Sequence, residues 1–495
     1  MALAFGLRLY GLGAKSMHGD EVKSHWVITH PDLKAILKTT FIDRTSGRPP
    51  LYYVLMHLYA RFAGADVWAL RLPSVLWGSL CVPLGFLLLR RFVSVRAAWL
   101  GAALLAAHPY FILPAQEIRD YAWLMMFALA STYVFLRLCL EEDRRWPMMV
   151  AYVFSNLAMT WTHHYGWLVA AAEGAFWLWA CARGWMAWRS ASFWFTLWAL
   201  LMVLSIPALY EFAYHFGREK MVNINPNPMS LPKYIKSLGG LFLHLGGGFR
   251  YGSLTLAELR ALLKQPWHVL MMTLSLVIPL AVILFGNARQ FTKAKSLSFF
   301  LGLQFVLTVL VAGVLMRSAI DARHMAVIAP AYALLLAIGI DQYFESYVLR
   351  GALLLWLAPL LLAHRYYYAL PYHPLLMDNY QAMTDQLNRD VGSHDVIVTD
   401  TENIPESYHV FRMYYHGSAP VMAIQVFWRR YFVNFPQPTL QNAETVWVSM
   451  SKQSLAHPQG WQNLQEFSRQ IAHPNIQVFD FGQARQWQRL VRLTR

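Results

Sequence analysis

Charged side chains are scarce in this sequence: they make up 14% of 495 residues, whereas hydrophobic residues make up 57% and aromatic residues 15%. A soluble globular chain is roughly one quarter charged and roughly half apolar. The shortage of charge excludes a disordered chain and an ordinary water-soluble enzyme. It indicates an integral membrane protein with a smaller water-exposed part.

Cysteine and acidic residues are also few. The three cysteines, Cys81, Cys139 and Cys181, all lie in apolar stretches, which excludes a disulfide framework. Basic residues outnumber acidic ones by 42 to 27, but they form short clusters between apolar runs. That pattern fits membrane topology and anionic lipid better than nucleic acid. The sequence contains no P-loop, G-x-G-x-x-G motif, zinc-ligand spacing or nucleophile elbow.

Ten apolar runs approach the length of a transmembrane helix, which needs roughly 20 mostly apolar residues. They are expected at about residues 68–90, 97–114, 120–140, 147–162, 165–183, 191–212, 266–286, 297–316, 324–342 and 348–369. A shorter stretch from Met1 to about Gly13 acts as the first span and lacks the features of a signal peptide. The prediction is therefore about eleven spans.

The orientation follows from the short connections between spans. Arginines gather in alternate connections, at Arg90, Arg91, Arg96, Arg137, Arg144, Arg145, Arg183 and Arg189. Under the positive-inside rule these connections are cytoplasmic. The segment 14–67, the loop 213–265 and everything after about residue 370 then lie on the outer side. Residues 47–64 are apolar but interrupted by charge, so we expect an interfacial helix there, with a true span as the alternative.

The composition changes after Tyr372. Alternating apolar residues predict strands at 395–400, 419–424, 445–450 and 476–481. Helical spacing appears at 378–391 and 406–416. We therefore expect a transmembrane domain over 1–370 and a small extracytoplasmic α/β domain over 371–495.

Polar clusters gather on the predicted outer face. They are HGDE at His18–Glu21, RTSGRPPLYY with Arg44 and Arg48, QEIRDY at Gln116–Tyr121, and RSAIDARH at Arg317–His324. Charge at a membrane boundary is costly, so its clustering on one side indicates function. Carboxylates beside basic groups at a lipid-facing surface suit acid–base chemistry on a phosphate-bearing lipid.

The first and third clusters also have structural interpretations. Asp20 and Glu21 could cap the helix expected just after them, because Asp is a favoured N-cap residue. Glu117, Arg119 and Asp120 could form a salt-bridge set at a helix start. These interpretations stay open beside the functional ones.

Other charged residues have comparable alternatives. Arg323 and His324 could anchor the end of a span at the interface. Glu173 lies inside a span, where it is either functional or bonded to a neighbouring helix. The EEDRR run at 141–145 falls in a cytoplasmic connection and is expected to be a solvated face.

Taken in order, these motifs form a pattern. HGDE, RPPLYY, ALRLPSVLWGSL and AAHPYFILPAQEIRDYAW follow one another along the chain. This order resembles the polytopic glycosyltransferases with the C-type fold, in particular the bacterial branch of the protein O-mannosyltransferase and lipid A aminoarabinose transferase superfamily. DARHMAVIAPAYALLLAIGI is similar to that superfamily's R-Y-x-x-P-type span. The resemblance covers most of residues 14–400.

The resemblance implies roles for the first two clusters. It makes Asp20 the catalytic base, with Glu21 beside it. It makes Arg48 the ligand of the lipid phosphate, because Arg48 opens a (K/R)-P-x-x-x-Y stretch that ends at Tyr53. Arg44 is a further substrate-binding candidate.

The resemblance also implies roles for the later clusters. The second loop of these enzymes supplies an acid and an arginine, which here are Glu117 or Asp120 and Arg119. Arg323 and His324 complete the substrate-binding candidates.

The function that the resemblance implies is transfer of a hexosyl or pentosyl group from a polyprenyl-phosphate donor to an acceptor hydroxyl. The acceptor is a protein, lipid A or a glycan, at the outer face of a bacterial plasma membrane, and inversion is expected. Arginines suffice for a monophosphate leaving group, so no cofactor is required, and the sequence implies no metal without excluding a divalent one. The alternatives are a ligase or polymerase with a diphosphate donor, and a secondary transporter.

Overall fold

The computed structural model describes residues 1–38, 40, 49–184, 191–210, 231–248, 260, 262–286, 292–311, 324–369, 380–400, 414–424, 437–451, 458–479 and 488–495. The chain divides into two compact units. The helical unit comprises Met1–Leu12 and His30–Tyr366, and the C-terminal unit comprises Gly13–Thr29 and Tyr367–Arg495. The segment with the HGDE motif thus belongs to the C-terminal unit, whereas the sequence analysis assigned it to the transmembrane domain.

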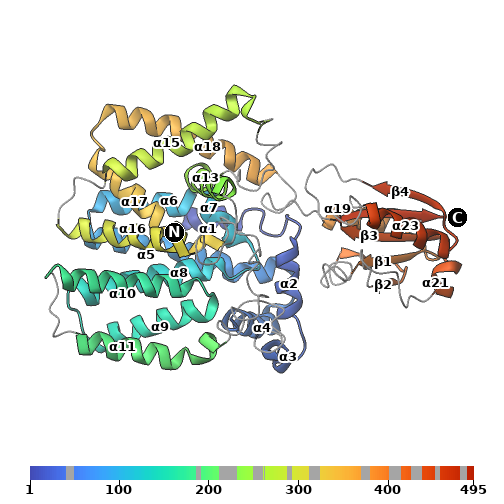
Figure 1. Cartoon of the computed structure of the whole chain (residues 1–495), viewed down its shortest axis with the longest axis horizontal. Coiled ribbons are helices and arrows are strands. Elements are labelled where there is room, and N and C mark those ends of the chain that lie inside the picture. The colour runs from blue at the N-terminus through green and yellow to red at the C-terminus, as the bar shows by residue number, and fades with distance from the viewer. Residues whose placement is uncertain are drawn as a thin grey trace. The chain divides into compact units, whose positions relative to one another are not determined.

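The helical unit accounts for all ten predicted spans. Its elements are α1 (Ala2–Leu9), α3 (Leu33–Leu37), α4 (Leu51–Ala63), α5 (Val67–Phe92), α6 (Val95–Ala107), α7 (Pro109–Ile112), η2 (Leu113–Gln116), α8 (Tyr121–Leu140), α9 (Trp146–Thr162), α10 (Gly166–Ala182), α11 (Ala191–Leu204), α13 (Leu231–Gly247), α15 (Pro266–Gly286), α16 (Thr292–Leu310), η6 (His324–Ile328), α17 (Ala329–Gln342) and α18 (Tyr347–Ala369) (Figure 1). Each predicted span overlaps one helix, except 97–114, which overlaps α6, α7 and η2, and 324–342, which overlaps η6 and α17. Helix α13 lies inside the predicted outer loop 213–265.

Several helices are long and apolar enough to cross a membrane. Among the described residues these are α5, α8, α15, η6 with α17, and α18. A sixth is formed if α6 is counted together with Pro109–Gln116, which continues it after a bend of 62°. The polytopic membrane class is therefore confirmed, while the number of eleven spans stays a prediction.

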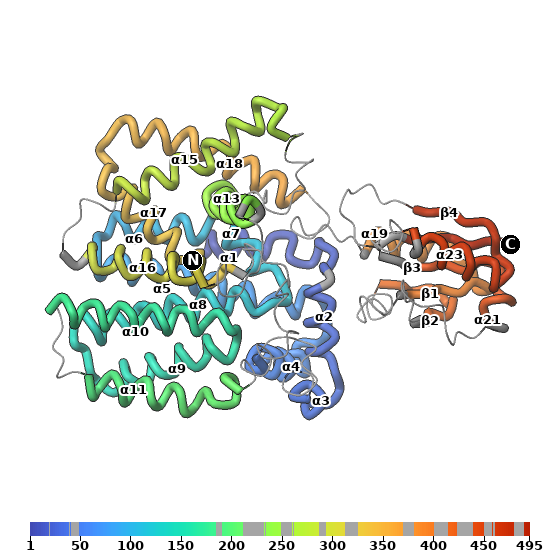
Figure 2. The backbone as a smooth tube through the Cα atoms, viewed as in Figure 1, coloured from blue at the N-terminus to red at the C-terminus, as the bar shows by residue number. Residues whose placement is uncertain are grey.

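Helices α8 and α17 lie at the centre of the helical unit. Their apolar windows are 78% and 94% buried, against 28% for α15. Figure 2 shows α9 and α11 on one side of this centre and α13 and α15 on the other. The α15–α17 crossing is close: a Cβ added to Gly286 would lie 2.3 Å from the Cα of Gly339. Small residues of this kind let membrane helices approach each other.

The buried acid Glu173 of α10 joins three helices. Its carboxylate accepts hydrogen bonds from Ser131 Oγ of α8 at 2.5 Å and from Tyr152 Oη of α9 at 2.8 Å. Asn156 Nδ2 of α9 donates to it at 3.4 Å. These contacts correspond to the expected bonding between neighbouring helices, which satisfies a polar group inside the membrane.

The C-terminal unit is a mixed sheet with helices. Its elements are α2 (Gly19–Ile28), α19 (Tyr380–Asp390), β1 (Val396–Asp400), β2 (Val421–Ile424), α21 (Gln437–Asn442), β3 (Thr445–Ser451), α23 (Pro458–Gln470), β4 (Asn475–Phe479) and β5 (Gln488–Thr494). The strand order is β2-β1-β3-β5-β4. Strand β1 runs parallel to β2 and β3, and β5 runs antiparallel to β3 and β4.

The strand predictions for this unit are confirmed at β1 to β4, and the helix predicted at 378–391 is α19. Strand β5 and helices α21 and α23 were not predicted. The helix expected at 406–416 lies almost wholly outside the described residues.

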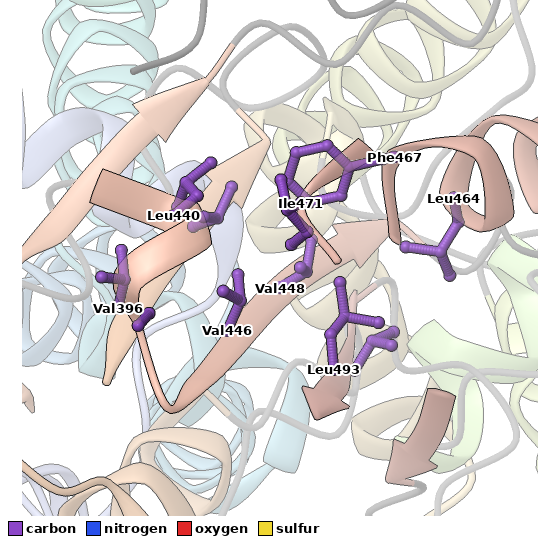
Figure 3. Packing of buried hydrophobic residues seen from close by; sticks show 11 residues of the cluster. Val396, Leu440, Val446, Val448, Leu464, Phe467, Ile471 and Leu493 are labelled. Carbon is purple, nitrogen blue, oxygen red and sulfur yellow. The ribbon is translucent and has the colours of Figure 1, made fainter. Parts of the chain in front are cut away.

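The core of the C-terminal unit lies between its sheet and two of its helices. Figure 3 shows Leu440 of α21 and Phe467 of α23 among strand residues such as Val446 and Leu493. All four side chains are fully buried. Burial of each such apolar side chain contributes roughly 1.5–3 kcal/mol, so this cluster is the main support of the sheet.

The segment before α2 is bonded to the rest of the C-terminal unit. Ser16 Oγ accepts a hydrogen bond from Gln381 N of α19 at 3.3 Å. Met17 N donates to the hydroxyl of Tyr414 at 3.4 Å. These two bonds attach the residues just ahead of the HGDE motif to a part of the chain almost 400 positions away.

Candidate active site

The HGDE motif forms the start of α2. His18 is the N-cap residue: its Nδ1 accepts from Glu21 N, and Glu21 Oε2 accepts from His18 N, both at 3.4 Å. This reciprocal arrangement is a capping box. The expectation that Asp20 caps this helix is therefore wrong, because the cap is supplied two residues earlier, by His18.

The two acids of the motif differ in their surroundings. Glu21 is fully buried and takes part in the cap, while Asp20 is half-buried. Both lie in the first helical turn, where the helix dipole favours negative charge. Of the two residues, Asp20 is the one that reaches the surface of its unit, which is what a base that acts on an incoming acceptor requires.

The QEIRDY motif forms the turn between η2 and α8 in the helical unit. Its charged residues are almost completely buried, with exposed fractions of 1% for Glu117, 5% for Arg119 and 2% for Asp120. The structural interpretation of this motif, a salt-bridge set at a helix start, stays open beside the functional one. Buried ionisable groups at the end of a membrane helix are costly and mark functional sites.

Neighbouring helices hold this turn. Ser74 Oγ of α5 donates to Arg119 O at 3.3 Å. The Arg119 guanidinium lies over the ring of Tyr121, 5.6 Å from its centroid, which is a cation–π geometry. The Tyr121 ring in turn lies 5.9 Å from the ring of His163, in the connection between α9 and α10. The start of α8 and the end of α9 therefore meet at the same place.

His163 is a candidate that the sequence analysis did not single out. It is 4% exposed, and its Nδ1 accepts a hydrogen bond from Tyr165 N at 3.0 Å. The available signal was the polar run THHYG in a short connection on the predicted outer side. Two adjacent histidines give no spacing pattern that indicates a site, so only the fold brings His163 to Tyr121.

Tyr53, a predicted substrate-binding residue, opens a chain of aromatic rings. It is buried in α4 and contacts Tyr52 edge-on, with centroids 5.4 Å apart. Tyr52 contacts Trp123 of α8 at 5.5 Å, and Trp123 contacts Trp77 of α5 at 5.1 Å. The chain connects the RPPLYY stretch to the first turn of α8.

This chain of rings ends at an apolar pocket in the helical unit. The pocket has a volume of about 430 Å³, and its walls come from α1, α4, α5 and α8. The walls include Phe5, Leu55, Met56, Leu76, Trp77 and Trp123. An almost wholly apolar wall of this kind suits a hydrocarbon chain and not a sugar.

The remaining candidates are placed only in part. Arg44, Arg48 and Arg323 lie outside the described residues. His324 begins η6, which packs against α8 and α17, so the backbone of the fourth cluster reaches the central helices. Within the described part of the chain, no three His, Cys, Asp or Glu side chains are placed to hold a metal ion. The cofactor expectation stays a prediction.

Comparison with known proteins places these features in a family context. The family model for dolichyl-phosphate-mannose-protein mannosyltransferase matches residues 47–210. The matched segment includes Tyr53, the pocket residues of α4 and α5, and the turn at Glu117–Asp120. A search of curated proteins finds no match.

Solved structures resemble the chain over most of its length. ArnT from Cupriavidus metallidurans, bound to undecaprenyl phosphate, has a TM-score of 0.56 and 14% identity, over 99% of this chain and 96% of that one. The oligosaccharyltransferase from Archaeoglobus fulgidus, in complex with zinc and sulfate, has a TM-score of 0.52 and 14% identity, over 90% and 67%. The predicted fold class is confirmed: the chain shares the fold of these structures, the C-type fold of membrane glycosyltransferases, and residues 47–210 match the mannosyltransferase family model.

Proposed function

We propose that this protein is a glycosyltransferase that moves a sugar from a polyprenyl-phosphate donor to an acceptor hydroxyl at the outer face of the bacterial plasma membrane. The observation that carries this proposal is the buried turn at Glu117–Asp120, which leads into α8 just ahead of the apolar pocket wall at Trp123. A lipid-linked sugar has an apolar chain and a charged phosphate. The helical unit places charged groups and an apolar pocket wall, one suited to each part, within one turn of α8.

Arg119 is proposed as a ligand of the donor phosphate. A guanidinium presents a planar set of N–H donors that match two phosphate oxygens at once. Its burial strengthens such a contact, because water competes less. Arg48 has the same role by its place in the RPPLYY motif, and Arg44, Arg323 and His324 remain proposed substrate contacts.

Asp20 is proposed as the catalytic base. It takes the proton of the acceptor hydroxyl while the acceptor oxygen forms its bond to the anomeric carbon. The bond between that carbon and the phosphate oxygen breaks on the opposite side, which inverts the configuration. Polyprenyl phosphate leaves with the electron pair, and arginine side chains stabilise its charge. Glu21, Glu117 and Asp120 are the further acids proposed to support this step.

The apolar pocket is proposed to hold the first part of the polyprenyl chain. Support for this donor class comes from ArnT, whose structure contains undecaprenyl phosphate, and from the archaeal oligosaccharyltransferase AglB, whose structure contains a dolichol-phosphate. The acceptor is a protein, lipid A or a glycan, and the transferred group is a hexose or a pentose.

The test uses the purified full chain in lipid nanodiscs. It is incubated with radiolabelled polyprenyl-phosphate sugars and, separately, with the matching polyprenyl-diphosphate sugars, each mixed with a membrane extract as the source of acceptor. Consumption of a monophosphate donor with release of polyprenyl phosphate is the expected result. Consumption of diphosphate donors alone would replace the proposal with a ligase or polymerase. Consumption of neither would contradict it.

A further inference from the structure

The span that leads to the QEIRDY turn is broken in its middle. Helix α6 ends at Ala107, and the chain continues from Pro109 after a 62° bend. Proline has no N–H, so Leu105 O loses its usual donor four residues later. Tyr110 N donates to His108 Nδ1 at 3.2 Å, which removes the usual donor for Ala106 O as well. In a membrane protein such backbone carbonyls need replacement partners.

Arg8 of α1 supplies those partners. Its side chain is fully buried, and its Nη2 donates to Leu105 O at 2.7 Å while its Nη1 donates to Ala106 O at 3.0 Å. The same Nη2 also donates to Phe111 O, on the far side of the break, at 3.2 Å. One guanidinium therefore bridges both halves of the bent span, which its forked donors allow.

The bent span returns bonds to α1. Gln116, the last residue of η2, donates from its Nε2 to Arg8 O at 2.7 Å and to Tyr10 O at 2.9 Å. These carbonyls lie at the C-terminal end of α1, where no further turn of the helix supplies N–H donors for them. We call this two-way set of bonds the Arg8–Gln116 lock. Gln116 immediately precedes Glu117, so the lock ends where the buried charged turn begins.

Helix α5 closes over the lock. A Cβ added to Gly78 of α5 would lie 2.6 Å from Ala115 Cβ and 3.3 Å from Arg8 Nε. A glycine is needed there because the η2 turn and the Arg8 side chain approach the α5 backbone so closely. Three elements, α1, α5 and η2, therefore fix the position of Gln116.

We propose that Arg8 and Gln116 are positioning residues for sugar transfer, which act through the Glu117–Asp120 turn and touch no reacting atom. The proposal rests on the proposed function. The lock sets the angle at which the bent span delivers Glu117, Arg119 and Asp120 to the start of α8. Misplacement of such groups by about 1 Å can lower a rate on the order of 100-fold, so a bond away from the chemistry can control it.

Two glutamines provide a matched test. Gln116 and Gln304 are both 4% exposed. Gln304 Nε2 of α16 donates to Thr132 Oγ1 of α8 at 3.0 Å, more than ten residues along that helix from the charged turn. Gln116→Met removes two bonds to backbone carbonyls and Gln304→Met removes one bond to a hydroxyl, so both should lower the melting temperature, Gln116→Met by more. Only Gln116→Met should lower kcat, by about 10- to 100-fold, with KM for the donor changed less; Gln304→Met should stay within about twofold of wild type.

Arg8 supplies a second comparison. Arg8→Lys keeps the charge but loses the planar fork, so it satisfies fewer carbonyls and should give an intermediate kcat. Arg8→Met should give the lowest kcat of the set. Equal kcat losses in the two glutamine variants, or wild-type kcat in Arg8→Lys, would overturn the proposal.

Hydrogen exchange tests whether the Arg8–Gln116 lock holds the turn, without any need for sugar transfer. Peptides that cover residues 113–121 should exchange faster in Gln116→Met than in wild type and should be unchanged in Gln304→Met. If the wild-type protein transfers no sugar, the proposed function fails while this exchange result still decides whether the lock holds the turn. Unchanged exchange in Gln116→Met would overturn the lock itself.

Discussion

Helix α8 has charged residues at both of its ends, and the two ends hold them in different ways. Near Leu140 they form ion pairs in which Arg91 and Arg145 are exposed, while the side chains of Glu141 and Asp143 are 14% and 11% exposed. Arg91 makes two bonds to Glu141, at 2.8 and 3.0 Å, and Arg145 Nε donates to Asp143 at 2.7 Å. The side chains of Arg91 and Arg145 are 51% and 71% exposed.

The Tyr121 end has no comparable exposure. Glu117, Arg119 and Asp120 are each at most 5% exposed, and they lie in a turn held by α1, α5 and the connection after α9. Exposed ion pairs contribute little to stability, whereas burial of charge is costly and persists only where something requires it. Burial of the charges, and not their number, therefore distinguishes the proposed reactive end of α8 at Tyr121 from the end at Leu140.

The C-terminal unit and the connection after α8 should lie on opposite sides of the membrane. Gln462→Cys, at an exposed position of α23, should react with an impermeant maleimide in intact spheroplasts, and Arg144→Cys, beside the ion pairs after α8, should react only after lysis. The three native cysteines are buried, so their background should be low. Labelling of each introduced cysteine in intact cells should be all or none, which makes this the largest expected effect. Labelling of Gln462→Cys only after lysis would reverse the proposed orientation.

The proposed base should have the next largest effect. Asp20→Asn keeps the size of the side chain and leaves the cap to His18, so expression and melting should stay normal. Turnover should fall by at least roughly 100-fold, as expected for loss of a general base. Asp143→Asn, at the exposed end of α8, is the control and should keep its turnover. An active Asp20→Asn enzyme would return this acid to a structural role in the first turn of α2.

Binding of the lipid phosphate should depend on Arg119, at the buried end of α8, and not on Arg91, near the other end. Arg119→Met should weaken binding of undecaprenyl phosphate by about 10- to 100-fold, since hydrogen bonds to charged groups contribute about 1.5–3 kcal/mol. Arg119→Lys should be intermediate, because a lysine lacks the fork. Arg91→Met, which breaks an exposed pair, should bind as wild type does. Calorimetric titration of nanodiscs measures all three, and equal affinities for Arg119→Met and Arg91→Met would contradict the phosphate role.

Acidification should cause only a small loss of the stability that the ion pairs near Leu140 contribute. Hydrogen bonds from Arg145, helped by Arg137, lower the pKa of Asp143 from 3.8 to about 2. A carboxyl with a lowered pKa in the folded state stabilises the protein above its ordinary pKa, and this contribution is lost as the pH falls through the folded value. The difference in melting temperature between wild type and Arg145→Met should therefore shrink as the pH is lowered from 5 toward 2. A difference that grows on acidification would contradict the pairing.

Local signals in the sequence explain which parts of the fold could be predicted. A long apolar run indicates a span without knowledge of its neighbours. In the same way, alternation of apolar and polar residues indicated the strands β1 to β4. Strand β5 was missed because Arg489 and Arg492 interrupt its alternation. It forms only because β3 and β4 pair with it from both sides.

The candidate site was less predictable, because its geometry depends on tertiary contacts. The motifs located Glu117, Arg119 and Asp120 but could not reveal their burial, which requires α1 and α5. Capping of α2 by Asp20 was one open interpretation because Asp is a favoured cap residue, whereas His18 occupies that position, with Glu21 completing the capping box. The Arg8–Gln116 lock joins residues more than a hundred positions apart, which no local pattern records.

Photo-crosslinking of the lipid tests the account most directly. A polyprenyl phosphate with a diazirine near its phosphate end is irradiated with the purified protein in nanodiscs, with and without excess unlabelled undecaprenyl phosphate. The account predicts competed adducts in the peptides of α4, α5 and the first turn of α8, around Leu55, Trp77 and Trp123. Competed adducts confined to the peripheral helix α15, with none at these pocket walls, would contradict it.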